Sequence, residues 1–167
     1  MEYGTLTRDS LRAGARGPGG RIPLPAEAGS TVRVIAVVEA APDQVFDAWL
    51  DPAIAGKWLF ATATRPSTRV AIDAQVGGAF CFVERTGGEH VEHAGVYVEI
   101  DRPRRLVFTL AGGKRSRDLS RVRVEIASQE NGSKLTLVHD NVPPDRADRI
   151  EARWTGMLYG LGVTLDS

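Results

Sequence analysis

The stretch AAPDQVFDAWLDP, residues 40–52, decides how the rest of the chain is interpreted. Pro42 suits the first position of a helix, because the N–H that it lacks would have no intrahelical partner there. Val45, Phe46 and Trp49 follow at the spacing that places side chains on one helical face. The Asp-Pro pair that closes the stretch ends this helix and can begin another. The stretch therefore predicts two short helices in succession.

The second predicted helix carries Ile54 and Trp58 on its apolar side. Before the helix pair, residues 31–39 (TVRVIAVVE) are rich in β-branched side chains, which favours a strand. After the pair, Gly-rich and Asn-Gly turn signals separate further strands, predicted at 69–73, 79–84, 91–100, 105–110, 119–127 and 134–139. We expect these strands to form an antiparallel meander.

A long helix is predicted for residues 144–165. Apolar side chains recur every three or four residues along it, on the face that must pack on the sheet: Ile150, Trp154, Leu158, Leu161 and Leu165. Gly156, Gly160 and Gly162 interrupt this helix, and each costs about 1 kcal/mol relative to alanine. Close contact between helix and sheet, a kink in the helix, or room for a ligand would each explain the glycines.

These elements together predict an α+β helix-grip fold. A curved antiparallel sheet of about six to seven strands would wrap around the long C-terminal helix, with two short helices after the first strand. One helix cannot fill the concave side of such a sheet, so we expect an apolar cavity between the two. Residues 31–167 would form this domain, and the Gly- and Pro-rich residues 1–30 a flexible N-terminal tail.

The composition excludes several classes of protein. The 167 residues fit one domain, and 21 basic residues balance 21 acidic ones, so no net charge attracts nucleic acid or a membrane surface. Cys81, the single cysteine, excludes an internal disulfide. No apolar run approaches the ~20 residues of a membrane span, and the first residues lack the apolar region of a signal peptide. We therefore expect a cytoplasmic protein.

Several motifs occur in a recognisable order. They are AAPDQVFDAWLDP with Trp58, D-x-x-x-G-G-x-F at 73–80, GVYVEIDRPRRLVFTL at 95–110, GSKLTLVHD at 132–140, and W-x-x-x-L at 154–158. In these motifs the chain resembles the START-like (SRPBCC) helix-grip superfamily. Within it, the chain is similar to the branch named after the C-terminal domain of the activator of the heat-shock-protein-90 ATPase. The resemblance covers residues 31–165 and implies the fold. For function it implies a range, from cavity binders of apolar or aromatic molecules to stress-related co-chaperone domains, cyclases and hydrolases.

The first functional hypothesis is a non-catalytic module that binds an apolar or aromatic small molecule between sheet and helix. Large aromatic side chains would supply contact area, and Met157 would adapt to the ligand's shape. No catalytic residue, metal ligand or cofactor is predicted. The predicted walls are Trp49, Trp58, Phe80, Phe82, Val96, Phe108, Val124, Leu137, His139, Trp154, Met157 and Leu158.

The orientation of the strand over residues 91–100 affects these walls. Alternation places Val96 and Val98 on its more apolar face, which we expect to point inward. His93 and Tyr97 would then lie nearer to solvent. If the strand were turned over, these two side chains would instead become polar groups of the cavity.

His139 shares a strand face with Leu135 and Leu137, so it should point inward near the mouth of the cavity. There it could hydrogen-bond a ligand, or carry a proton in an enzyme of the cyclase or hydrolase kind. A histidine satisfied at the edge of the core is the alternative. His90 and His93 point to opposite strand faces, which argues against a two-histidine metal site.

A local basic stripe is the basis of a further hypothesis, a protein-interaction or chaperone-regulating module. Its cations, in a hairpin predicted at residues 114–123, are Lys114, Arg115, Arg117, Arg121 and Arg123. They could contact an acidic protein partner, or they could form an ordinary solvated face. No aromatic residues interleave with them, so nucleic acid is not expected. The sequence is also compatible with a homodimer.

Overall fold

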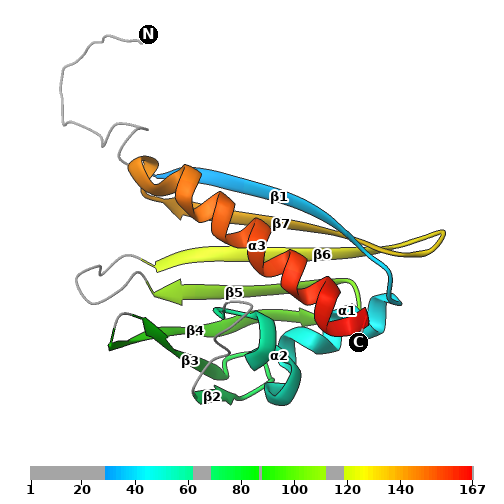
Figure 1. Ribbon diagram of the computed structural model, residues 1–167, viewed down its shortest axis with the longest axis horizontal. Coiled ribbons are helices and arrows are strands. Elements are labelled where there is room, and N and C mark those ends of the chain that lie inside the picture. The colour runs from blue at the N-terminus through cyan, green and yellow to red at the C-terminus, as the bar shows by residue number, and fades with distance from the viewer. Residues whose placement is uncertain (1–28, 62–68, 87, 112–118, 167) are drawn as a thin grey trace, which may run out of the picture.

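A seven-stranded antiparallel sheet and one long helix dominate the computed structural model (Figure 1). The structure describes residues 29–61, 69–86, 88–111 and 119–166. The predicted N-terminal tail falls almost entirely outside these ranges. In chain order the elements are β1 (Ser30–Val38), α1 (Pro42–Leu50), α2 (Pro52–Trp58), β2 (Arg69–Ile72), β3 (Ala79–Thr86), β4 (Glu89–Asp101), β5 (Arg105–Ala111), β6 (Leu119–Gln129), β7 (Gly132–Val142), the 3-10 turn η2 (Pro144–Arg146) and α3 (Ala147–Asp166).

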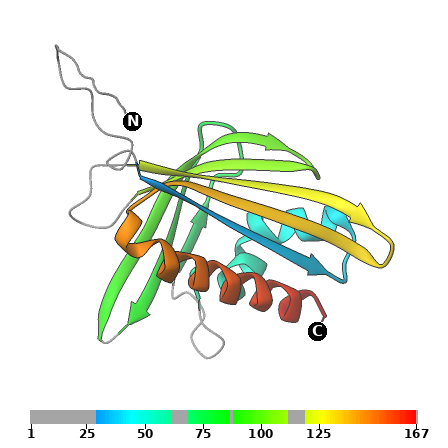
Figure 2. The ribbon, with the colours of Figure 1, turned by 90° about the horizontal axis from the view of Figure 1, so that it is seen from above.

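The strands lie in the order β1-β7-β6-β5-β4-β3-β2, so the sheet after β1 is a simple meander. The sheet is strongly twisted, and α3 crosses one of its faces (Figure 2). Helices α1 and α2 contact the C-terminal half of α3 (Figure 1). The predicted α+β helix-grip fold, including the two short helices after the first strand, is confirmed.

The helix pair forms as its sequence predicts. Pro42 is the first residue of α1, and the Asp51 carboxylate accepts a hydrogen bond from the Ala53 backbone N–H (3.0 Å), which caps α2. The Trp58 indole N–H donates to the Ala48 carbonyl oxygen at 3.1 Å. This bond joins the end of α2 to the end of α1 and holds both tryptophan-bearing helices against the core.

Aromatic side chains fill the space between the middle of the sheet and α3. The rings of Trp49 and Trp58 meet edge to face with centroids 4.7 Å apart, and Trp154 lies 6.2 Å from Trp49. Phe80 and Phe108 meet edge to face as well, at 5.4 Å. Beside these rings a void of about 10 Å³ remains, the size of one water molecule at most. The centre of the grip is therefore packed, and free volume has to lie elsewhere.

The sequence-based prediction that Val96 and Val98 of β4 point inward is wrong. Val96 is 40% exposed and Val98 also faces outward, whereas Tyr97 is buried at 3% exposure. The pairing with β5 jumps from Tyr97–Phe108 to Glu99–Val107, so Val98 is the extra residue of a β-bulge. One extra residue reverses the alternation beyond it. As a result Tyr97 and Ile100 both pack inward, although they are three positions apart and would lie on opposite faces of a regular strand.

The three glycines of α3 do not mark a close approach of helix and sheet. A methyl group added at Gly160 would lie 3.6 Å from the Trp58 Cβ, an ordinary contact, and one at Gly162 would meet no described atom within 4 Å. The Gly-Gly turn before β3 is different. Gly77 has a φ of +87°, and a side chain at Gly78 would collide with the Asp73 carbonyl oxygen. That turn accounts for the spacing D-x-x-x-G-G in the sequence.

Candidate functional site

A cavity of about 590 Å³ lies at the N-terminal end of α3. Its apolar walls come from the segment after α2, the ends of β5 and β7, and the first half of α3: Phe60, Leu110, Val142, Ile150, Trp154 and Met157. Its polar groups come from β4, β6, β7, η2 and α3: His93, Ser120, His139, Asn141, Arg146 and Arg153. The volume and the mixture of walls are those of a site for a small organic molecule.

His139 forms one wall of the cavity and is held by two hydrogen bonds. The Trp154 indole N–H donates to its Nδ1 at 3.0 Å, so Nδ1 must carry a lone pair. The proton of the neutral ring is therefore on Nε2, which donates to the Ser120 hydroxyl oxygen at 2.7 Å. The Ser120 hydroxyl in turn donates to the Leu110 carbonyl oxygen at 3.2 Å. Burial lowers the pKa of His139 to about 4, so the ring is neutral at pH 7.

On the other side of the cavity, Phe60 positions His93. The two rings stack in parallel, with centroids 4.4 Å apart and planes within 6°. Phe60 has a φ of +53°, uncommon for a bulky residue, and its backbone N–H donates to the Met157 sulfur at 3.1 Å. The backbone turn after α2 therefore presents an aromatic ring to both β4 and α3.

Glu84 of β3 connects His93 to Arg153. Its carboxylate oxygen accepts from His93 Nε2 at 2.8 Å and from Arg153 Nη2 at 2.6 Å, and the residue is 7% exposed. Burial by itself would raise the pKa of Glu84, but the hydrogen bonds from Arg153 and His93 outweigh it, and the pKa is lowered. Burial lowers the pKa of His93, and Glu84 opposes this only in part. Glu84 is thus an ionised carboxylate that orients Arg153 at the edge of the cavity.

The predicted wall residues do not all meet in one place. His139, Trp154 and Met157 line the large cavity. Trp49, Phe80, Phe82 and Phe108 surround the small central void instead. Trp58 lies in a groove between α2 and α3, Leu158 in a groove between β1 and α3, and Val124 and Leu137 are fully buried in the core. Val96 lies on the outer face of the sheet because of the bulge in β4.

Apart from His139, Trp154 and Met157, the residues that line the cavity were not among the predicted walls. Those that matter most for its chemistry are Phe60, His93, Arg146 and Arg153, of which His93 was expected there only if the strand over residues 91–100 were turned over. A signal existed for Arg153, since it follows Ile150 by three residues and directly precedes Trp154 in the apolar stripe. The alternative orientation of β4 would have placed His93 inside. For Phe60 and Arg146 no local pattern in the sequence points to the cavity.

Within the described ranges, no group of three or more His, Cys, Asp or Glu side chains could hold a metal ion. None of the described helices is long and apolar enough to cross a membrane. Burial raises the pKa of the Cys81 thiol, which keeps it protonated at neutral pH.

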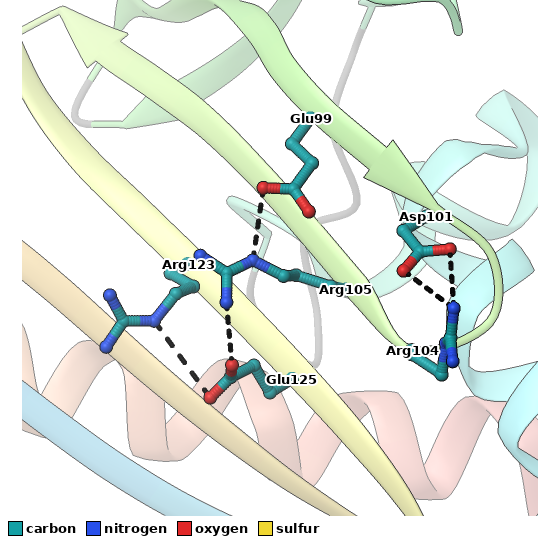
Figure 3. A network of polar contacts seen from close by, with 6 residues as sticks. All are labelled: Glu99, Asp101, Arg104, Arg105, Arg123 and Glu125. Carbon is teal, nitrogen blue, oxygen red and sulfur yellow. Dashed lines mark hydrogen bonds and ion pairs between the residues drawn. The ribbon is translucent and has the colours of Figure 1, made fainter.

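The basic stripe of the sequence is described only in part, since Lys114, Arg115 and Arg117 lie outside the described residues. Arg123 lies 4.0 Å from the Glu125 carboxylate, at the edge of a network on β4, β5 and β6 (Figure 3). At the centre of this network, Arg105 bonds both Glu99 (3.1 Å) and Glu125 (3.0 Å). The arginines of this network lie beside glutamates, so Arg123 is not part of a purely basic patch.

A long helix held by a twisted antiparallel sheet defines a helix-grip protein of the START-like superfamily. More particularly, the chain belongs to the family described as Activator of Hsp90 ATPase homolog 1-like protein, which it matches over residues 39–166. The resemblance read from the sequence is thereby confirmed. No protein of curated function matches the chain.

Solved structures of similar proteins share the fold. A crystal structure of a protein from Chromobacterium violaceum has 25% identity and a TM-score of 0.72, and the match covers 80% of this chain and 95% of that one. An AHSA1-like protein from Aeromonas hydrophila, solved by NMR, has 24% identity and a TM-score of 0.72, with 82% and 92% covered. A protein from Arthrobacter aurescens has 18% identity and a TM-score of 0.73, with 87% and 91% covered.

Proposed function

We propose that this protein binds a small apolar or aromatic molecule in the cavity at the N-terminal end of α3. The observation that carries the proposal is the cavity itself, about 590 Å³ of space beside a core that is otherwise packed. Pockets for small organic ligands commonly have about 300 to 1,000 Å³, mostly apolar walls and a few polar groups that set orientation. This cavity has all three properties.

His139 serves in this proposal as an orienting group. A proton-transferring histidine needs one ring nitrogen that can accept a proton from the reacting molecule. Nδ1 of His139 already accepts the Trp154 N–H, and a proton placed on Nδ1 would oppose that donor. The pKa of about 4 also leaves the ring neutral over the physiological range. These features favour binding over acid–base catalysis by this residue.

A protein-interaction role for the basic hairpin has less support among the described residues. Arg123 contributes to a charge-balanced network, and exposed ion pairs of this kind are screened by salt. Arg121 by itself makes no basic patch.

The proposal is tested by a thermal-shift screen against apolar and aromatic small molecules, both charged and uncharged. A ligand present at 100 times its dissociation constant adds about 2.7 kcal/mol to the free energy of unfolding. Ile150→Trp should fill part of the cavity and abolish the shift. Val163→Trp is the matched control, because Val163 lies on the exposed face of the same helix, away from the cavity walls.

Hits that stabilise the wild-type protein and the Val163→Trp variant, but not the Ile150→Trp variant, would support a ligand in this cavity. Flat curves across the screen would refute the proposal. So would hits that stabilise the Ile150→Trp variant equally well.

A further inference from the structure

The charged side chains that line the cavity are cationic. Arg146 and Arg153 belong to its walls, whereas none of its described wall residues is Asp or Glu. Both histidines that line it are held neutral at pH 7, since burial lowers the pKa of each. The guanidinium groups are therefore the charges that a molecule in this cavity would meet, and guanidinium is the side chain best suited to bind a carboxylate in bidentate fashion.

Arg153 is already oriented. Its Nη2 donates to Glu84, which fixes one edge of the guanidinium at the rim of the cavity. An arginine side chain has five N–H donors, and this bond uses one of them. The Arg153 side chain is 45% exposed, so its remaining donors stay accessible. Glu84 thus holds Arg153 in place, and its negative charge offsets part of the positive charge of the guanidinium.

Arg146 is the less restrained of the two cations. It lies in η2, immediately before α3, and forms no ion pair with a carboxylate in the described part of the chain. None of the described carboxylates nearby in sequence lies in the cavity wall. Asp140 accepts a hydrogen bond from the Thr31 hydroxyl at 3.0 Å, and neither Asp145 nor Asp148 is a wall residue of the cavity. Arg146 therefore gives the cavity wall a positive charge that is not ion-paired with a carboxylate among the described residues.

A molecule that complements apolar walls and an unpaired cation at one end has an apolar part and an anionic part. We infer that the ligand is an organic acid, an apolar or aromatic body that packs on Phe60, Ile150 and Trp154 with a carboxylate bound by Arg146 and Arg153. This inference rests on the proposed function, since it identifies the chemical class of the molecule in the same cavity. A charged group also explains why the polar groups gather at one cavity while the centre of the core is apolar.

The test compares acids with alcohols that have the same apolar body. The pairs are 1-naphthaleneacetate with 2-(1-naphthyl)ethanol, and decanoate with 1-decanol, titrated into the full chain at pH 7.5 by calorimetry. Each acid should bind at least about tenfold more tightly than its alcohol, as expected for a charge-assisted contact. Added salt should weaken binding of the acids and leave binding of the alcohols unchanged.

Arg146→Gln should abolish most of the preference for the acid. Arg149→Gln is the matched control, because Arg149 is an exposed arginine three residues away that is not a wall residue. If the alcohols bind as tightly as the acids, or if both variants behave alike, the inference is overturned while the binding function stands. If neither member of either pair binds, both the inference and the proposed function fail.

Discussion

Lowering the pH from 7 to 5 is expected to destabilise the wild-type protein more than a His139→Gln variant. The pKa of His139 falls from 6.5 to about 4 on folding, because burial disfavours the imidazolium. Between these two values the unfolded chain binds a proton that the folded protein does not. Stability therefore rises with pH in this window and is lost as the pH falls through it. Glutamine has a donor and an acceptor, as neutral imidazole does, but does not titrate.

The size of the effect follows from the two pKa values. At pH 5 the unfolded residue is almost fully protonated and the folded one mostly neutral, which costs about 2 kcal/mol of stability. At pH 7 the same cost is only about 0.2 kcal/mol. The difference between the two pH values is thus about 2 kcal/mol for this one residue, or roughly 4 to 8 °C in Tm for a chain of this size.

Urea denaturation of both proteins at the two pH values measures the effect. Other groups that titrate in this range, His93 among them, are present in both proteins, so the difference between the two pH-dependent losses isolates His139. Equal losses would refute the reasoning. NMR of the wild-type imidazoles gives an independent reading: the structure requires a neutral His139 protonated on Nε2 at pH 6, and a doubly protonated ring at that pH would contradict it.

Three further predictions concern a buried hydrogen bond, a helix glycine and a surface ion-pair network. Trp58→Phe should lower the free energy of unfolding by about 1 to 2 kcal/mol more than Trp49→Phe, as measured by chemical denaturation. The reason is that the Trp58 N–H bonds a carbonyl of α1, while the buried Trp49 N–H has no partner among the described residues. Equal losses would show that this bond contributes nothing. Gly162→Ala should raise the free energy of unfolding by about 1 kcal/mol, since the added methyl group meets no described atom, and a decrease would reveal a requirement for glycine there. Arg105→Gln should lower the free energy of unfolding by less than about 1 kcal/mol, because the two glutamates that pair with Arg105 (Figure 3) are exposed to solvent. The loss should be smaller still in high salt, and a large, salt-independent loss would contradict this prediction.

Local patterns were sufficient wherever one element has a single buried face. The stripe on α3 packs inward as predicted, with Trp154, Leu158 and Leu161 buried. His139 points inward because it shares strand parity with Leu135 and Leu137, and no bulge intervenes between them. In such elements the periodicity of the sequence reports the fold directly.

Strand β4 is where this reasoning failed. A bulge at Val98 shifts the pairing by one residue, and neither glycine nor proline marks it in the sequence. The bulge lies opposite β5, and the Tyr97 backbone also bonds the Gly77-Gly78 turn. Its position therefore depends on two partner segments that lie on either side of β4.

The sequence by itself determined the order of the elements, the buried faces of α1, β6, β7 and α3, and the family. The position and charge of the cavity were decided by the tertiary structure alone. Its walls come from parts of the chain that lie far apart in the sequence, among them a residue after α2 and an arginine of η2. A helix or strand pattern reports which side chains are buried, because burial follows from one element and its neighbours. Where buried side chains leave space depends on how all the elements fill the core together, and no local pattern contains that information.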